Sequence, residues 1–267
     1  MIVLNGVLMM VTNMYVINHF GRIKLSKEIK VINSCAFRDC TSLTKIEIPN
    51  SVTRICSNAF YKCTSLTKIE IPNSVTEIGD YAFYDCSSLT KIEIPNSVTE
   101  IGDYAFYDCS SLKKIEIPEG VTEIGDSLFE YCTSLTEVKG LDNVTKIGYW
   151  AFSHCSSLKT LHLSKNLKSL DAESFYKSDN IELTIGTSLF FITHDRGQKS
   201  KINCFPHNTT IYGIKCNSTE LIPTIQKKEL EDKINEYLKN KNIVDKNGDH
   251  SKFINHVIES YKGEDYY

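Results

Sequence analysis

The sequence predicts a curved α/β solenoid, a stack of similar coils, from three observations. Seven phenylalanines recur every 23 residues, at Phe37, Phe60, Phe83, Phe106, Phe129, Phe152 and Phe175. Six cysteines keep the same interval, at Cys40, Cys63, Cys86, Cys109, Cys132 and Cys155. Segments 70–92 and 93–115 are identical except that Lys113 takes the place of Thr90. A fixed period of this length indicates stacked supersecondary units rather than a compact enzyme fold.

Each unit is expected to contain a short strand on the concave side. Ile92 and Ile94 are two residues apart, so they face the same side of an extended segment, and Lys91 and Glu93 face the other. The strand ends at Pro95, which has no N–H to donate to a continuing ladder. Because every coil repeats the same direction, the strands of successive coils should pair in parallel.

The rest of the unit should form the convex side. Residues 98–101 make a second extended run that Gly102 ends. Asp103 is a good helix cap, so we expect one helical turn that carries Phe106 and Cys109 inward. A single unit has too few apolar side chains for a core of its own. Stacking must therefore bury them, at about 1.5–3 kcal/mol per large side chain.

A long motif within the repeat resembles a known family. The string SVTxIGxxAFxxCxSLxxIxIP occurs at 74–95 and, almost unchanged, at 97–118. It resembles the BspA-like leucine-rich repeat family. Leu89, Ile92 and Ile94 also agree with the L-x-x-L-x-L spacing of leucine-rich repeats.

The resemblance covers about residues 21–185 and extends to both ends. Residues 4–12 are similar to the hairpin that precedes such repeats, and residues 208–221 are similar to the closing strand and turn of bacterial members. The family implies a curved solenoid used for binding, often at a microbial cell surface, without catalytic residues. The chain departs from the pattern at Lys139-Gly140, and the repeat is lost in 186–207.

Four regions are expected along the chain. They are an N-terminal hairpin cap at 1–20, a leucine-rich repeat solenoid at 21–185, an irregular terminal repeat and closing strand at 186–217, and C-terminal helices at 218–267.

The N-terminus favours a hairpin over a secretory signal or an uncleaved anchor. Asn5-Gly6 lies between apolar runs, which is a strong two-residue hairpin pattern. A signal peptide needs a basic first region, and no Lys or Arg precedes Arg22. The chain by itself therefore suggests a cytoplasmic protein, whereas the resemblance implies the cell surface, and the localisation stays open.

Two C-terminal segments have helical patterns. Residues 223–240 and 251–261 carry apolar side chains at helical spacing, so they are interpreted as a cap on the last coil or as an element that docks a partner. Between them, 245–249 places oxygen ligands as a calcium loop does. His250 stands where that loop needs glycine, which favours a polar turn.

The regular cysteines are interpreted as buried apolar thiols. Equivalent positions point the same way in every coil, whereas a disulfide needs Cβ vectors that face each other. No C-x-x-C pair indicates a metal site. Cys204 and Cys216 stand outside this series, and whether they pair, bind metal with His194 and His207, or do neither stays open.

Composition and motifs narrow the function classes. The net charge of −3 gives no electrostatic reason to expect nucleic acid or anionic membrane as a partner. No apolar run reaches the roughly 18 residues of a transmembrane helix. Neither a phosphate-binding glycine loop nor a zinc-protease or nucleophile-elbow motif occurs. We therefore expect a protein that is not an enzyme and that has no cofactor, metal or catalytic residue.

The outward side of the concave strands is the candidate binding site. Strands lie about 4.8 Å apart, so lysines and glutamates should form two adjacent rows. The order inverts at Glu137 and Lys139, and His162 follows in the next unit. The predicted partner-binding residues are Lys68, Glu70, Lys91, Glu93, Lys114, Glu116, Glu137, Lys139 and His162.

Three hypotheses of function follow. The first is a solenoid that binds a protein partner through these rows, although such a surface also suits simple solvation. The second, which rests on the resemblance alone, is a cell-surface adhesin that binds host matrix or other cells. The third is a structural spacer without a ligand, because copying a stable unit, as in 70–92 and 93–115, lengthens a rod.

Overall fold

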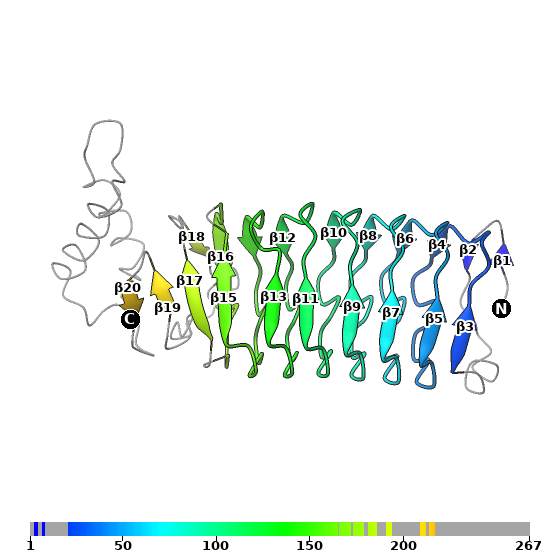
Figure 1. Ribbon diagram of the computed structural model, residues 1–267, viewed down its shortest axis with the longest axis horizontal. Helices are drawn as coiled ribbons and strands as arrows, with labels where there is room; N and C mark the ends of the chain where they lie inside the picture. Colours follow the sequence, from blue (N-terminus) through cyan, green and yellow to red (C-terminus); the bar gives the residue numbers. More distant parts are fainter. Residues whose placement is uncertain are drawn as a thin grey trace, which may run out of the picture.

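A computed structural model describes residues 3–4, 7–8, 21–164, 166–171, 173–178, 181–185, 191–193, 209–211 and 214–216 of the chain. These residues form a solenoid of stacked coils with two rows of strands (Figure 1). The predicted parallel solenoid is confirmed. The α/β class is wrong for the described residues, which contain strands and turns but no α-helix. The predicted C-terminal helices, the 245–249 loop and Cys204 lie outside them.

The first row of strands carries the lysine and glutamate positions. Parallel pairing joins β3 to β5, β7 to β9, β11 to β13, and β15 through β17 to β19, and β20 adds antiparallel to β19. The strands are β3 (Arg22–Lys24), β5 (Lys45–Glu47), β7 (Lys68–Glu70), β9 (Lys91–Glu93), β11 (Lys114–Glu116), β13 (Glu137–Lys139), β15 (Thr160–Leu163), β17 (Glu182–Ile185), β19 (Thr209–Ile211) and β20 (Ile214–Cys216).

The second row lies on the opposite side of the coils (Figure 1). It is parallel apart from β1 and β2, which pair antiparallel with Val3 opposite Leu8. Its last strand, β18, lies where the sequence shows no repeat. The four-region division remains a prediction. The strands are β1 (Val3–Leu4), β2 (Val7–Leu8), β4 (Val31–Ile32), β6 (Arg54–Ile55), β8 (Glu77–Ile78), β10 (Glu100–Ile101), β12 (Glu123–Ile124), β14 (Lys146–Ile147), β16 (Ser169–Asp171) and β18 (Phe191–Thr193).

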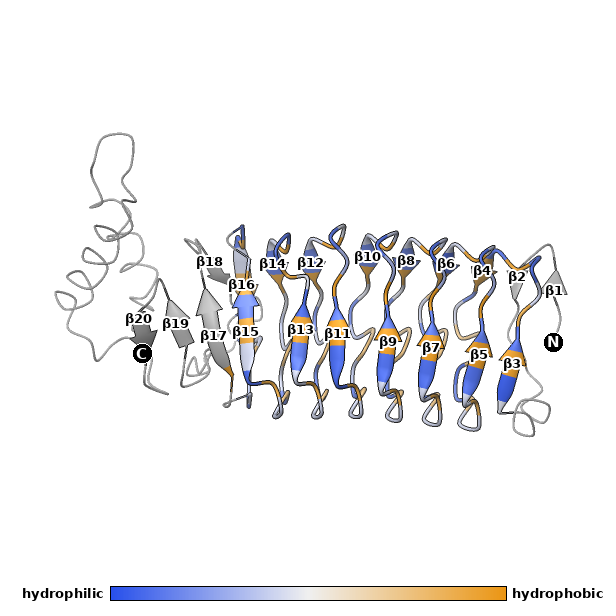
Figure 2. Ribbon diagram, in the orientation of Figure 1, coloured by the Kyte–Doolittle hydropathy of each residue, from blue (hydrophilic) through white to orange (hydrophobic). Residues whose placement is uncertain are grey.

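The core is a set of apolar ladders that run along the solenoid. The central residue of each first-row strand, such as Ile69 or Ile92, is buried, while the flanking Lys and Glu are exposed. Figure 2 shows this as hydrophobic bands within otherwise hydrophilic strands. The repeated phenylalanines are buried and stack ring on ring, with centroids 5.2–5.8 Å apart. Burial across coil boundaries therefore holds the stack together.

The regular cysteines form a second buried ladder. Each thiol from Cys63 onward donates a hydrogen bond to the carbonyl oxygen of the phenylalanine in the preceding coil, as Cys86 does to Phe60 over 3.2 Å. In the coil after Cys155, Ser178 takes the same position and donates to Phe152. All cysteines from Cys35 to Cys155 are free, which confirms the interpretation as buried thiols for the regular series.

The segment predicted to be a helical turn has another conformation. Tyr104 and Asp108 have left-handed φ values of 57° and 50°, which an α-helix cannot contain. The N–H groups of Tyr104, Phe106 and Asp108 donate to carbonyl oxygens of the next coil over 2.8–3.1 Å. Asp103 does not cap its own turn, because its Oδ1 accepts from the N–H of Asp126 at 2.8 Å. The N–H groups of this segment thus alternate: three bond to the next coil, whereas those of Tyr107 and Cys109 donate to the carbonyl oxygens of Tyr104 and Phe106 in their own coil.

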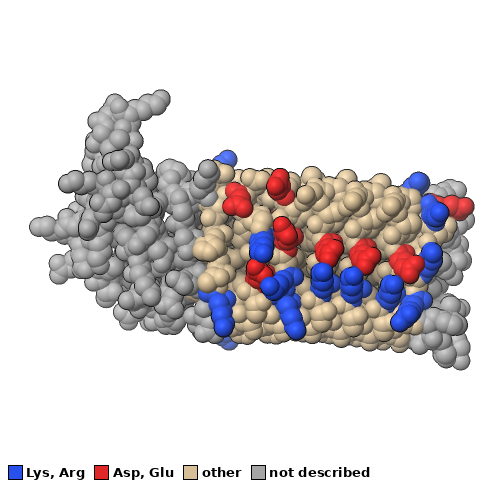
Figure 3. Space-filling view, viewed as in Figure 1, with Lys and Arg blue, Asp and Glu red and all other residues tan. Residues whose placement is uncertain are grey.

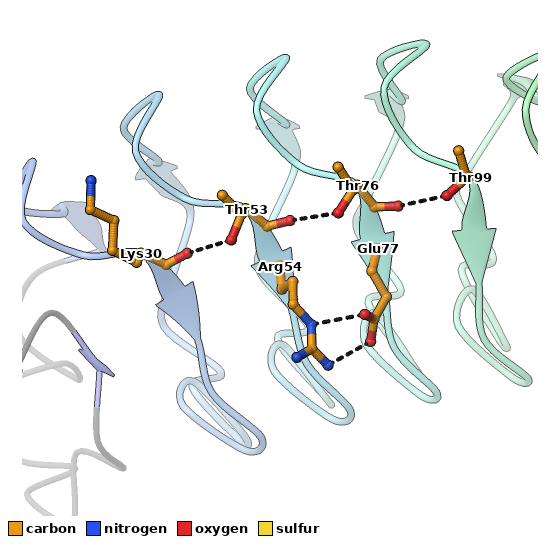
Figure 4. Close-up of polar contacts among 6 residues, drawn as sticks. All are labelled: Lys30, Thr53, Arg54, Thr76, Glu77 and Thr99. Carbon is orange, nitrogen blue, oxygen red and sulfur yellow. Dashed lines mark hydrogen bonds and ion pairs between the residues drawn. The ribbon is translucent and has the colours of Figure 1, made fainter.

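Polar ladders fix the register on the second row. Thr53, Thr76 and Thr99 each donate a hydroxyl hydrogen to the carbonyl oxygen one coil back, over 3.2–3.5 Å (Figure 4). Arg54 makes a two-point contact with Glu77, at 2.8 and 2.9 Å. These side-chain contacts each join residues 23 positions apart, so they hold every coil in register with its neighbours.

Candidate partner-binding face

The outward side of the first-row strands forms a charged surface that we call the Lys–Glu face. Figure 3 shows a row of basic side chains beside a row of acidic ones along the described coils. Each Lys-Ile-Glu strand buries the isoleucine, so its two charged residues must face solvent. The Lys–Glu face consists of Lys45, Glu47, Lys68, Glu70, Lys91, Glu93, Lys114, Glu116, Glu137 and Lys139.

In the middle coils the charges pair within one strand. Lys68 Nζ lies 2.7 Å from Glu70 Oε1, and Lys91 Nζ lies 2.6 Å from Glu93 Oε1. The hydrogen bond from Lys68, and then its charge, lower the pKa of Glu70, and Lys91 does the same for Glu93. These carboxylates stay ionised at neutral pH, but their charges are already matched by their own lysines.

The pairing changes where the charge order inverts. Lys114 stands opposite Glu137, and Glu116 stands opposite Lys139. Glu137 accepts from both lysines, with Lys114 Nζ at 2.7 Å and Lys139 Nζ at 3.1 Å. The hydrogen bonds from Lys114 and then Lys139 lower the pKa of Glu137. Glu116 makes no ion pair within the described residues, so its carboxylate is available to a partner.

A groove of about 660 Å³ crosses the face at this inversion. Ile92, Ile94 and Ile115 also border it, but Ile92 and Ile115 are buried in the core and only Ile94 is half-buried. Six of the nine predicted site residues line it, namely Lys91, Glu93, Lys114, Glu116, Glu137 and Lys139. The structure thus brings together the charges on both sides of the inversion, in a volume typical of binding pockets.

The other three predicted residues do not line this groove. Lys68 and Glu70 lie on β7, one coil before it. His162 is exposed on β15, where its register partner is Thr184 of β17. The predicted row is therefore continuous along the face, but only its middle part is hollowed.

Sequence reasoning missed three residues of the groove. Thr90, Asn96 and Lys113 also line it. Thr90 and Lys113 are the single difference between segments 70–92 and 93–115, and the structure places both of them in the groove. A substitution between otherwise identical copies was the signal that would have found them.

The Lys–Glu face offers charged groups that could bind a partner. No group of three or more His, Cys, Asp or Glu side chains in the described residues is placed to hold a metal ion. The charged groups on the Lys–Glu face are exposed and lie in ion pairs or in the groove. In the described part of the chain no helix is long and apolar enough to cross a membrane.

The sequence matches a known protein family. The chain matches the family described as the BspA type leucine rich repeat region (6 copies) at residues 13–136, 76–202 and 122–235. The chain belongs to this family. No curated protein matches the sequence. Members of the family are leucine-rich repeat proteins, which agrees with an interaction surface built from repeated strands.

Solved structures of bacterial leucine-rich repeat proteins are similar to the chain. A leucine rich cell surface protein from Faecalibacterium prausnitzii A2-165 is 35% identical with a TM-score of 0.58, over 61% of this chain and 48% of that one. The T. pallidum leucine rich repeat protein is 39% identical with a TM-score of 0.49, over 51% of this chain and 64% of that one. The chain spans less than two thirds of either protein. The first similarity supports the leucine-rich repeat solenoid.

Proposed function

We propose that this repeat protein binds another protein through the groove on the Lys–Glu face and carries out no catalysis. The observation that supports this most is that the groove holds charged groups of both signs without an ion-pair partner in the described residues. Glu116 and Lys113 both line the groove, and neither makes an ion pair within the described residues. Elsewhere on the face, pairs such as Lys68–Glu70 already satisfy their charges.

The groove fits an extended segment of the partner. An apolar side chain of that segment would cover the half-buried Ile94 and the aliphatic stems of Lys91 and Lys114. A basic residue would reach Glu116 and an acidic residue would reach Lys113. Charges of both signs fix the orientation of a partner more than they add affinity.

Charge reversal in the groove tests the proposal. Wild type, Lys91→Glu/Lys114→Glu and Glu116→Lys would be used as baits in lysate and medium of the native organism. Lys45→Glu is the matched control, because Lys45 belongs to the same row but lies outside the groove. A partner that the control retains and both groove variants lose by at least about tenfold, or 1.4 kcal/mol, would support the site.

Two results would contradict the proposal. A partner that all variants retain would place binding elsewhere on the molecule. The absence of any specific partner would favour the spacer hypothesis, in which the face is only solvated.

A cell-surface role is the second candidate, and one observation favours it. The F. prausnitzii protein with the similar fold is described as a cell surface protein. The corresponding function here is an adhesin that binds host matrix or other cells. Antibody labelling of intact, unpermeabilised cells tests it: surface labelling supports the adhesin, and recovery only from the cytosol rejects it.

A further inference from the structure

The first coil contains a second cavity, which lies apart from the groove on the Lys–Glu face. It has a volume of about 680 Å³ and is formed by the turn that follows β3 and the turn that follows β5. Its lining residues are Lys24, Leu25, Lys27, Lys30, Glu47, Ile48, Pro49, Asn50 and Ser51. Three lysines thus face one carboxylate. Figure 3 shows that basic side chains gather at this end of the described coils.

The single carboxylate of this cavity is already neutralised. Glu47 Oε2 lies 3.7 Å from Lys24 Nζ, and its Oε1 lies 3.5 Å from Lys45 Nζ. Lys27 and Lys30 make no ion pair in the part of the chain that the structure describes, and both are exposed. The cavity therefore carries an excess of positive charge that no carboxylate among the described residues pairs with.

Lys27 and Lys30 have no equivalent lysine in the next five coils, and lysines return at these two positions as Lys165 and Lys168. Lys27 occupies the position held by Asn50, Asn73 and Asn96 in later coils. Lys30 occupies the position held by Thr53, Thr76 and Thr99. These two lysines are therefore not a feature of every coil.

The backbone under the lysines is held firmly in place. The N–H of Ile29 donates to the Ser26 carbonyl at 3.1 Å, and Ser51 Oγ donates to the Ile29 carbonyl at 2.6 Å. The Lys30 carbonyl accepts from Thr53, while the Lys30 ammonium extends away from the residues drawn with it (Figure 4). The charged groups are therefore mounted on a preorganised turn, which lowers the entropic cost of binding.

We propose that this cavity binds an anionic saccharide that carries sulfate groups. Lysine ammonium groups match sulfate oxygens as point charges. The half-buried Ile48 and Pro49 provide apolar surface for the C–H face of a sugar ring, and the exposed Asn50 amide offers hydrogen bonds to hydroxyl groups. The volume is in the range of small-molecule sites.

Calorimetric titration of the full chain tests the proposal. The probes are a heparin-derived hexasaccharide, a hyaluronan hexasaccharide with carboxylates only, neutral maltohexaose, and inorganic tripolyphosphate. We expect the sulfated saccharide to bind tightest, maltohexaose not to bind, and affinity to fall as salt is raised. Tripolyphosphate that binds as tightly as the sulfated saccharide would overturn the saccharide assignment and leave a simple oxyanion site.

Variants connect the binding to the cavity. Lys27→Gln/Lys30→Gln should weaken binding of the sulfated saccharide at least tenfold, whereas Lys113→Gln, which removes an exposed lysine that lines the other groove, should not. Lys91→Glu/Lys114→Glu should also retain binding, so failure of the partner groove and failure of this site are distinguishable. Unchanged affinity in Lys27→Gln/Lys30→Gln, or equal losses in all variants, would overturn the proposal.

Discussion

Cys86 donates its thiol hydrogen to the carbonyl oxygen of Phe60 in the preceding coil, with 3.2 Å between sulfur and oxygen. Burial raises the pKa of the Cys86 thiol well above its ordinary value, so the group stays protonated and remains a donor. Since the same bond recurs along the stack, this thiol is both a small core side chain and a link between coils.

Cys86→Ala should lower the free energy of unfolding by about 1–3 kcal/mol, because it leaves a cavity and removes one of the two hydrogen bonds that the Phe60 carbonyl accepts, the other coming from the N–H of Cys63. Cys86→Ser should lose less, since Ser178 makes the equivalent bond in its own coil. Urea denaturation measures both. Cys56→Ala, at a half-buried site outside the ladder, is the control, and a loss as large as that of Cys86→Ala would contradict the assignment.

Phe106→Ala should destabilise the protein by about 3–5 kcal/mol. The Phe106 ring is fully buried and stacks on Phe83 at 5.5 Å and on Phe129 at 5.8 Å, so truncation opens a cavity shared by three coils. Phe106→Leu refills part of that space and should lose clearly less. Equal losses for the two variants in denaturant unfolding would mean that volume is not the cause.

Gly140→Val should cost about 1–3 kcal/mol. Gly140 has a φ of 78°, and a Cβ there would overlap the carbonyl oxygen of Ile117 in the preceding coil. The neighbouring residue, Lys139, lines the groove, so partner binding should weaken as well. Gly120→Ala is the control, because an added Cβ would meet only the Thr99 side-chain methyl closely, at 3.0 Å. A control as unstable as Gly140→Val in thermal unfolding would argue against this explanation.

The contribution of Glu137 to stability should depend on pH in one direction. Its pKa is lowered from the ordinary 4.5 by Lys114 and Lys139, so folding favours the ionised form. The stabilisation is present above pH 4.5 and is lost as the pH falls through the lower folded-state value. The difference in Tm between wild type and Glu137→Gln should therefore be small but positive at pH 7 and shrink in acid. A difference that grows in acid would contradict the pairing.

Deletion of residues 70–92 should leave a folded, shorter solenoid. Ile69 would then join Glu93, whose segment repeats the deleted one, so the Thr53 carbonyl could accept from Thr99 as it now does from Thr76. Circular dichroism and urea unfolding should show the native strand signal and one cooperative transition. Removing only residues 70–81 breaks the register and should unfold the chain. Loss of cooperativity in the full-coil deletion would contradict the view of coils as interchangeable units.

Much of the fold could be predicted because it depends on periodicity alone. Ile92 and Phe106 recur at a fixed interval, and their burial follows from stacking whatever the details of the turn. The turn itself was misread as helical, since Asp103 is a favourable cap in isolation. Tyr104 and Asp108 instead adopt left-handed φ values, and their N–H groups donate to carbonyl oxygens of the next coil. This conformation depends on the neighbouring coil, which a local sequence pattern does not include.

The candidate site, like the fold, could be predicted from the sequence only in part. Sequence alternation was enough to place Lys91 and Glu116 on one outward surface. It gave no indication that a groove lies between β9 and β13. Nor did it indicate that Glu137 forms ion pairs with two lysines, so that Glu116 has no ion-pair partner in the described residues. Those features depend on which side chains meet across coils.

By itself, the sequence determined the solenoid, the direction of its strands and which residues are buried, because a 23-residue period of apolar positions can bury them only by stacking. Tertiary structure alone decided the groove beside Lys113 and the cavity beside Lys27 and Lys30. Both are shaped by side chains of adjacent coils, and the distances and charges between those side chains exist only once the coils are packed together.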